Sequence, residues 1–193
     1  MRGAEDLDPL EITAFIVSVL AVWLTTIRKP LCWPIGILSV ILYTAVFYDS
    51  RLYSDALLQV FFAVLNGYGW WKWFHTPRTD GRPQVQQPHK RNIFAHLAMG
   101  CAGAAALGAL MSHYTDATFP WLDASLTAFS LVAQYWMARV YTINWPLWIA
   151  VDIVYVGMYV SKGLSLTAAL YAGFIGLAAY GWREWHRAAN QTV

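Results

Sequence analysis

The sequence repeats itself at a fixed offset of 112 residues, and this repeat limits the possible folds more than any other feature. Trp33-Pro34 aligns with Trp145-Pro146 (145 − 33 = 112), and Trp73 aligns with Trp185. Further matches at the same offset are Tyr43/Tyr155, Leu52/Leu164, Ala56/Ala168, Leu58/Leu170, Phe62/Phe174, Tyr68/Tyr180 and Gly69-Trp70/Gly181-Trp182. Each copy is about three apolar segments long. A duplicated apolar bundle is the usual plan of a secondary transporter, which binds its substrate where the repeats meet.

The composition indicates that most of the chain lies in a lipid bilayer. Of its 193 residues, 58% are apolar and 12% are charged, and the mean hydropathy is +0.41. Soluble domains average about 25% charged residues, so this balance is typical of a membrane protein. We therefore expect residues 1–193 to form a single all-α integral membrane domain.

Seven apolar runs have the length of roughly 17 to 25 residues that a membrane-spanning helix needs. They cover residues 10–28, 31–48, 52–74, 92–113, 119–139, 144–160 and 164–183. The run 92–113 has no partner in the repeat, and one extra crossing makes the two triplets run parallel. We therefore expect a 3+1+3 arrangement: a three-helix repeat at 10–74, a linker helix at 92–113 and a second repeat at 119–185.

The basic residues predict the orientation of these spans. Three of the 13 Lys and Arg residues fall on the face that holds the N-terminus: Arg2, Arg51 and Lys162. The other ten fall on the opposite face: Arg28, Lys29, Lys72, Arg78, Arg82, Lys90, Arg91, Arg139, Arg183 and Arg187. Because cytoplasmic loops carry the excess of Lys and Arg, we expect the N-terminus outside and the C-terminus in the cytoplasm.

Polar residues follow helical spacing in three of the spans and are expected to face a common cavity. They are Asp55, Gln59 and Asn66; Asp123, Thr127, Ser130 and Gln134; and Asn144, Trp148, Asp152, Tyr155 and Tyr159. A single Ser or Thr in a membrane helix often only bonds a neighbouring helix. Asp152 is the strongest candidate, because a mid-span carboxylate costs roughly 3 kcal/mol on insertion scales. Asp55 and Asp123 lie near the outer ends, where a helix N-terminal charge is an equal explanation.

The repeat fails at several of these polar positions. The residues Asn144, Trp148, Asp152, Thr127 and Gln134 align with Cys32, Gly36, Val40, Phe15 and Val22. The scaffold is therefore duplicated while the polar chemistry is confined to one copy. An asymmetric solute bound on the pseudo-axis explains this difference.

The residue types at these positions suggest a ligand. Trp145 and Trp148 next to Asp152 suit a planar heteroaromatic cation, while the amides of Gln134 and Asn144 suit a carboxamide or ribose hydroxyls. The remaining tryptophans at the inner ends of the third and seventh spans are expected to be interfacial anchors: Trp70, Trp71, Trp73, Trp182 and Trp185. The sequence contains no nucleophile–base pair, metal-ligand spacing or phosphate loop. We therefore expect no enzyme activity, catalytic residue, cofactor, metal or nucleic-acid partner.

Four motifs resemble the PnuC-type vitamin transporters, and the resemblance covers about Ile12 to Trp185. They are Trp33-Pro34-Ile35-Gly36, residues 52–59, residues 66–73, and Asn144-Trp145-Pro146-Leu147-Trp148-Ile149-Ala150-Val151-Asp152. The last motif, which Gln134 precedes, is the most specific. The resemblance implies a nicotinamide riboside transporter of the bacterial inner (plasma) membrane with a full-length SWEET-like fold. It also implies facilitated diffusion, with a cytoplasmic kinase that phosphorylates and traps the vitamin.

The resemblance also implies binding residues, namely Gln134, Asn144, Trp145, Trp148 and Asp152, with Gln59 and Asn66 from the first half. Thr127 and Tyr155 complete the candidate site from the polar spacing. Two alternatives stay open: thiamine or a related vitamin as substrate, and a receptor or assembly subunit that transports nothing. Besides the substrate and the bilayer, we expect a second copy of the chain as partner. The small residues of the linker helix could pack against their own bundle or a neighbouring subunit: Gly100, Gly103, Ala104 and Gly108.

Overall fold

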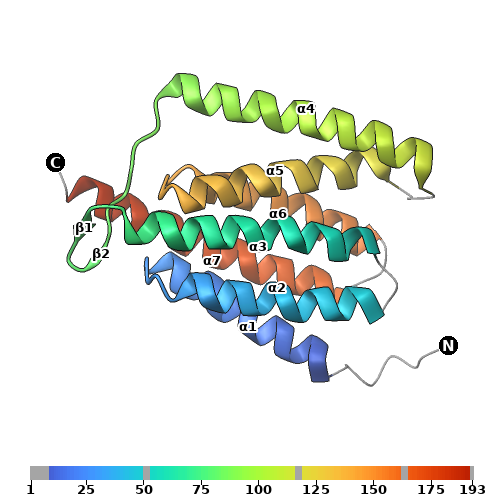
Figure 1. The fold of residues 1–193 in the computed structure, drawn as a ribbon, viewed down its shortest axis with the longest axis horizontal. Coiled ribbons are helices and arrows are strands. Elements are labelled where there is room, and N and C mark those ends of the chain that lie inside the picture. The colour runs from blue at the N-terminus through green and yellow to red at the C-terminus, as the bar shows by residue number, and fades with distance from the viewer. Residues whose placement is uncertain (1–8, 50–52, 116–118, 162–164, 192–193) are drawn as a thin grey trace. The chain divides into compact units, whose positions relative to one another are not determined.

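A computed structural model describes residues 9–49, 53–115, 119–161 and 165–191 (Figure 1). Within these ranges the chain forms seven helices and one short hairpin. They are α1 (Pro9–Thr26), α2 (Cys32–Asp49), α3 (Tyr53–Phe74), β1 (Arg78–Thr79), β2 (Arg82–Pro83), α4 (Lys90–Tyr114), α5 (Pro120–Ala138), α6 (Asn144–Ser161) and α7 (Ser165–Asn190). The seven helices confirm the positions of the expected spans to within a few residues, except that α7 continues to Asn190 instead of ending near residue 183.

The contacts divide the chain into two compact units, Met1–Pro83 and Gln84–Val193. In the first unit, α2 packs against both α1 and α3. In the second unit, α5 packs against both α4 and α6, and α6 packs against α7. The helix expected to link the repeats therefore packs on the first helix of the second repeat.

The same buried aromatic arrangement occurs once in each unit. Trp33 meets Trp73 edge to face at 5.2 Å and 89°, and Trp145 meets Trp185 at 5.3 Å and 87°. All four side chains are at most 1% exposed. The expectation that Trp73 and Trp185 are interfacial anchors is therefore wrong, whereas the side chains of Trp70, Trp71 and Trp182 are exposed.

Two glycines make room for these rings. A Cβ atom on Gly69 would lie 2.2 Å from the Trp33 ring, and one on Gly181 would lie 2.6 Å from the Trp145 ring. Trp73 and Trp185 each follow their glycine by four residues, so they lie on the same inward face of α3 and α7. This spacing is the physical reason that these two tryptophans are buried rather than interfacial.

The turns that follow α1 and α5 also have matching geometry at the offset of 112. Arg28 and Val140 have φ angles of 55° and 56°. The amide of Lys29 donates to the Leu24 carbonyl at 3.0 Å, and the amide of Tyr141 donates to the Trp136 carbonyl at 3.0 Å. This six-residue hydrogen bond, with a left-handed residue inside it, is a Schellman motif. The two copies therefore share local backbone structure where their sequences differ.

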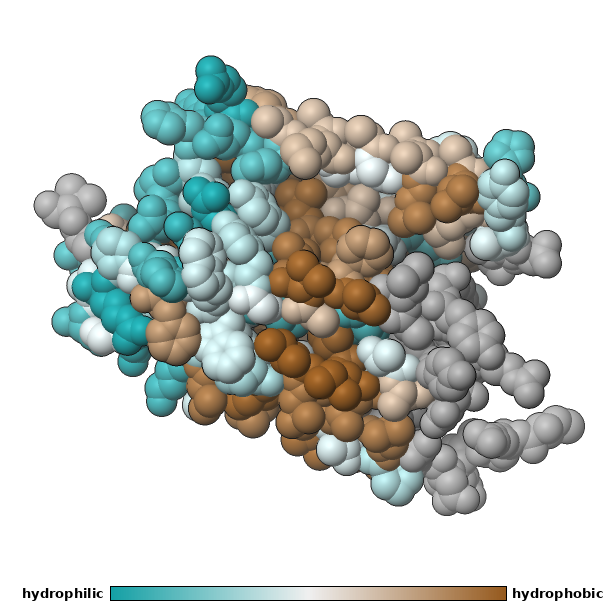
Figure 2. Space-filling view, in the orientation of Figure 1, coloured by the Kyte–Doolittle hydropathy of each residue, from teal (hydrophilic) through white to brown (hydrophobic). Residues whose placement is uncertain are grey.

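α4 is a long apolar helix whose side chains are mostly exposed. Among the described helices, it alone is long and apolar enough to cross a bilayer by length and composition. Figure 2 shows hydrophilic residues at both ends of α4 and less polar residues between them. Its side chains between these ends are mostly exposed, including Phe94 and Met99, as expected for a surface that faces lipid.

The small residues of α4 pack inside this chain. Gly100, Ala104 and Gly108 are the buried residues of the helix. A Cβ atom on Gly108 would lie 2.5 Å from the Trp121 ring, and one on Gly100 would lie 3.0 Å from Phe129. Small residues let helices approach closely in a bilayer. This face of α4 therefore packs on α5 of the same chain.

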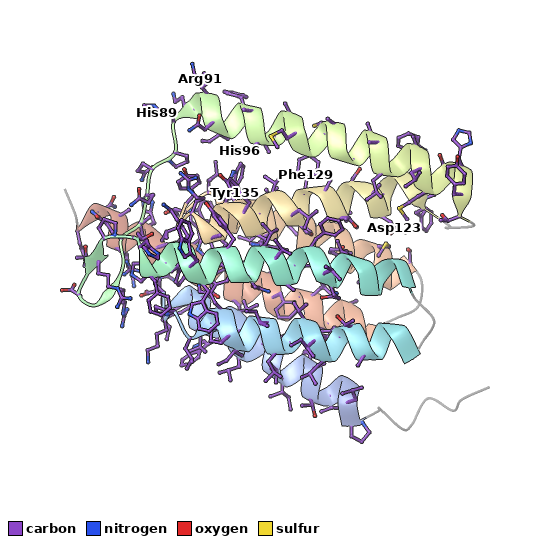
Figure 3. The ribbon with its side chains drawn as sticks, viewed as in Figure 1. His89, Arg91, His96, Asp123, Phe129 and Tyr135 are labelled. Carbon is purple, nitrogen blue, oxygen red and sulfur yellow. The ribbon has the colours of Figure 1, made fainter. Side chains whose placement is uncertain are left out.

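A side-chain hydrogen bond joins α4 to α5 near the start of α4. The indole Nε1 of Trp136 donates to Nδ1 of His96 at 2.9 Å. The imidazole also meets the Tyr135 ring edge to face at 5.1 Å, and Figure 3 shows the two side chains next to each other. Because Nδ1 accepts this hydrogen bond, it carries no hydrogen of its own, and the neutral His96 ring carries its hydrogen on Nε2.

Replacing His96 by Ala should lower the free energy of unfolding by about 1 to 3 kcal/mol, because the buried Trp136 indole loses its acceptor. Thermal unfolding of the purified protein in detergent measures this loss. The double variant His96→Ala/Trp136→Phe should lose less than the sum of the single variants. Strict additivity would contradict a direct energetic role for the bond.

The hairpin between α3 and α4 was not expected. Strands β1 and β2 pair Arg78 with Pro83 and Thr79 with Arg82. Asp80 and Gly81 lie between them with φ angles of 52° and 74°. Two left-handed residues in a two-residue loop are typical of a type I′ turn, and Asp-Gly is a preferred sequence for it.

Candidate functional site

Asp152 is the most unusual side chain of the second unit. It lies mid-way along α6 and is 5% exposed. Among the described residues, no cation forms an ion pair with its carboxylate. A buried carboxylate without a partner is costly, and such residues in membrane helices mark ligand or ion sites. Asp152 is therefore the centre of the candidate site.

The first turns of α6 present three further polar atoms with free bonding capacity. Asn144 is fully buried, and its Nδ2 donates to the Tyr141 carbonyl at 2.6 Å. Its Oδ1 and the Nε1 atoms of Trp145 and Trp148 are buried without a protein partner. Asn144, Trp148 and Asp152 are four residues apart, so they lie along one face of α6. This face offers an acceptor, a donor and an acid to a ligand.

α5 supplies polar residues beside α6. Gln134 and Ser130 are buried, and Thr127 is half-buried. The Ser130 side chain is hydrogen-bonded to the Tyr155 hydroxyl of α6. The structure thus brings the predicted residues of the fifth and sixth spans onto two helices that pack together.

Trp145 differs from Trp148. Its ring is 1% exposed and is enclosed by Gly181 and Trp185. Trp33 is enclosed in the same way by Gly69 and Trp73 in the first unit. Trp145 therefore has a structural role that belongs to the repeat, and its role in binding stays a prediction.

Trp145→Leu and Trp33→Leu should therefore destabilise the protein by similar amounts, about 3 kcal/mol each, because each removes a buried ring from a fitted space. Thermal unfolding in detergent measures both losses. A Trp145→Leu variant that unfolds like the unmodified protein would contradict the structural role.

In the first unit, Asn66 is buried on α3 and Gln59 is half-buried. A Cβ atom on Gly36 would lie 3.2 Å from the Asn66 Oδ1, so this part of α2 leaves room for the amide. At the offset of 112, Gly36 and Asn66 align with Trp148 and Ala178. The first copy therefore has the small residue on its second helix and the larger one on its third, and the second copy has the reverse. Gln59 and Asn66 stay predictions as site residues. The side chain of Asp55 lies outside the described residues.

A cluster of three half-buried tyrosines extends the face of Asp152 toward the end of α6. Tyr155 and Tyr159 are stacked at 5.9 Å and 15°. Tyr171 of α7 lies 4.8 Å from Tyr155 and 5.2 Å from Tyr159, tilted by 38° and 34°. Sequence reasoning missed Tyr171, although it aligns with the candidate Gln59 (171 − 59 = 112). Adding 112 to the number of each candidate in the first copy would have identified Tyr171 from Gln59.

Asp123 of α5 also approaches the tyrosine cluster, because its charge acts on the Tyr155 hydroxyl as that of Asp152 does. It is half-buried in the first turn of α5, and Figure 3 shows it near the opposite end of α5 from Tyr135. A carboxylate in the first turn is stabilised by the helix dipole. Its position therefore has a structural explanation that the mid-helix position of Asp152 lacks.

Comparison with known proteins gives one consistent family. The chain matches the family described as nicotinamide mononucleotide transporter over residues 8–187. It is 26% identical to the nicotinamide riboside transporter PnuC of Escherichia coli K12, over 98% of this chain and 90% of that protein. It is 28% identical to the riboflavin/roseoflavin transporter RibM of Streptomyces davaonensis, over 79% of this chain and 73% of that protein.

The fold is also similar to that of a solved relative. A crystal structure of the vitamin B3 transporter PnuC matches with a TM-score of 0.76 at 22% identity, over 94% of this chain and 82% of that chain. Together with the family match, this likeness confirms the all-α membrane fold and the resemblance to PnuC-type proteins. The chain therefore belongs to the nicotinamide mononucleotide transporter family of integral membrane proteins.

Proposed function

We propose that this protein carries nicotinamide riboside across the bacterial inner membrane by facilitated diffusion. The observation that carries the proposal is the buried, unpaired carboxylate of Asp152 beside the free Trp148 indole nitrogen and the free Asn144 carbonyl oxygen. Nicotinamide riboside is a pyridinium with a carboxamide and a ribose. The carboxylate of Asp152 would balance its positive charge, and the Trp148 ring would stack on its flat ring. The amides of Asn144 and Gln134 would form hydrogen bonds with its carboxamide or ribose hydroxyls. The PnuC relative of Escherichia coli, which is named for this substrate, supports the assignment.

The proposal includes the arrangement of the two copies and their direction in the membrane. The matching tryptophan pairs and Schellman turns support two parallel three-helix repeats joined by α4. The distribution of Lys and Arg supports an external N-terminus and a cytoplasmic C-terminus. A cytoplasmic kinase that phosphorylates the riboside would then trap it and keep the inward gradient favourable.

Riboflavin is a second candidate because RibM is a relative. Riboflavin has no fixed positive charge, however, so it gives the Asp152 carboxylate no counter-charge. Thiamine is also a flat cation and satisfies the acid and the ring, but it lacks the carboxamide and the ribose. The amide groups of Asn144 and Gln134 therefore favour the riboside over thiamine.

Binding to the purified protein tests the substrate directly. We expect calorimetric titration to show tighter binding of nicotinamide riboside than of thiamine or riboflavin. Tighter thiamine binding would transfer the proposal to thiamine, and tighter riboflavin binding would remove the role assigned to Asp152. If the riboside binds but does not cross liposomes, the protein is a receptor or assembly subunit.

A further inference from the structure

The tyrosine cluster of Tyr155, Tyr159 and Tyr171 lies next to Asp152, so a ligand bound to Asp152 would contact these rings. Tyr155 follows Asp152 by three residues and Tyr159 follows it by seven, so both continue the Asp152 face of α6. The charges of Asp123 and Asp152 both act on the Tyr155 hydroxyl, and that of Asp152 also acts on the Tyr171 hydroxyl. The acid and the rings therefore belong to one environment within the second unit.

The three rings are held in place but are not sealed in the core. Tyr155 is hydrogen-bonded to Ser130, and the hydroxyls of Tyr159 and Tyr171 are hydrogen-bonded to each other. Tyr171 also meets Phe174 edge to face at 5.9 Å. All three tyrosines are half-buried, unlike the paired tryptophans of the same unit. Rings tilted by 34° to 38° with a partly open side can offer a π face to a cation.

The two copies differ here in a correlated way. Tyr155 and Tyr159 align with Tyr43 and Phe47, so both copies keep two aromatic rings. Asp152 aligns with Val40, and Tyr171 aligns with Gln59. The third ring therefore occurs only in the copy that carries the acid. A carboxylate and an additional π face are the two groups that recognition of a flat organic cation requires.

We infer that Tyr171 is a specificity-determining residue, which adds a third aromatic face beside Asp152 and favours cationic over neutral heteroaromatic ribosides. This inference rests on the proposed function, because it names the residue that selects the charge state of the same substrate. The ring supplies the attraction, and the hydrogen bond to Tyr159 orients it. Tyr171 therefore contributes selectivity that Asp152 alone does not provide.

The test compares two ligands of nearly equal shape on the full-length purified protein. Nicotinamide riboside is cationic, and its reduced dihydronicotinamide form is neutral. The measured quantity is the ratio of their dissociation constants. Because an inactive fraction changes the number of sites and leaves each constant unchanged, this ratio reports selectivity even in a partly unfolded variant.

Tyr171→Leu should reduce the preference for the cation by about tenfold, within the range that cation–π contacts supply. Tyr171→Phe keeps the ring and should keep most of the preference. Phe174→Leu is the matched control, because it removes an aromatic neighbour of Tyr171 from the same helix and should leave the ratio unchanged.

An unchanged ratio in Tyr171→Leu would overturn the inference, as would an equal loss of preference in Tyr171→Leu and Phe174→Leu. Both results can be distinguished from failure of the proposed function. If the proposed function were wrong, the unmodified protein would itself bind neither riboside.

Discussion

Asp152→Asn is expected to weaken the binding of nicotinamide riboside by about 10- to 100-fold, since interactions with a charged partner contribute about 1.5 to 3 kcal/mol. The substitution keeps the shape of the side chain and removes its charge. Binding of neutral dihydronicotinamide riboside should change much less. Calorimetric titration of the purified variant with both ligands measures the two effects, and equal losses would contradict a charge-balancing role for Asp152.

The stability of the same variant provides an independent check. The Asp152 carboxylate is buried without an ion-pair partner among the described residues, so neutralising it should leave the melting temperature unchanged or raise it. Asp123→Asn is the comparison variant, because Asp123 also acts on the Tyr155 hydroxyl but lies in the first turn of α5. It should weaken binding less than Asp152→Asn does, because the helix dipole already stabilises the Asp123 charge. A large stability loss in Asp152→Asn would instead indicate a structural acid.

Gly69→Ala should destabilise the protein by about 1 to 3 kcal/mol or more, because overpacking a closely fitted core has this cost. The new methyl group would lie 2.2 Å from the Trp33 ring, which is itself held against Trp73. Gly181→Ala should behave alike, since its methyl group would lie 2.6 Å from the Trp145 ring. Thermal unfolding in detergent measures both losses.

Gly67→Ala is the control for Gly69, because both residues lie in α3 and nothing lies within 4 Å of a Cβ atom on Gly67. It should be neutral or stabilise the helix by up to about 1 kcal/mol, the difference in helix propensity between Gly and Ala. Gly176→Ala serves in the same way for Gly181 in α7. If Gly69→Ala were as stable as Gly67→Ala, the close packing of glycine against tryptophan would be refuted.

The helices were predictable because long apolar runs and charged breaks depend on the bilayer rather than on tertiary detail. The hairpin at Arg78–Pro83 was missed, although Asp80-Gly81 is a recognised turn signal, because a strand of two residues leaves no periodic pattern. The burial of Trp73 and Trp185 was missed because interfacial and buried tryptophans occur at the same helix ends. The four-residue spacing from Gly69 and Gly181, recurring in both copies, distinguishes them.

The candidate site was predictable where the repeat fails. Asn144, Trp148 and Asp152 were identified because the first copy carries small or apolar residues at those positions. Trp145 shows the limit of this reasoning, since it lies in the same motif and yet packs as Trp33 does in the first copy. Tyr171 lies on a different helix from the motif. Its ring contacts with Tyr155 and Tyr159, and the effect of the Asp152 charge on its hydroxyl, associate it with Asp152.

Transport by the isolated protein is the most direct test of the central claim. Purified protein would be reconstituted into liposomes that contain no kinase, no nucleotide and no ion gradient, and uptake of labelled nicotinamide riboside would be followed. We predict that the riboside equilibrates to its external concentration, faster than in protein-free liposomes, and that Asp152→Asn slows this equilibration. Absence of uptake by protein that binds the riboside, or accumulation above the external concentration when a pH gradient is imposed, would contradict facilitated diffusion.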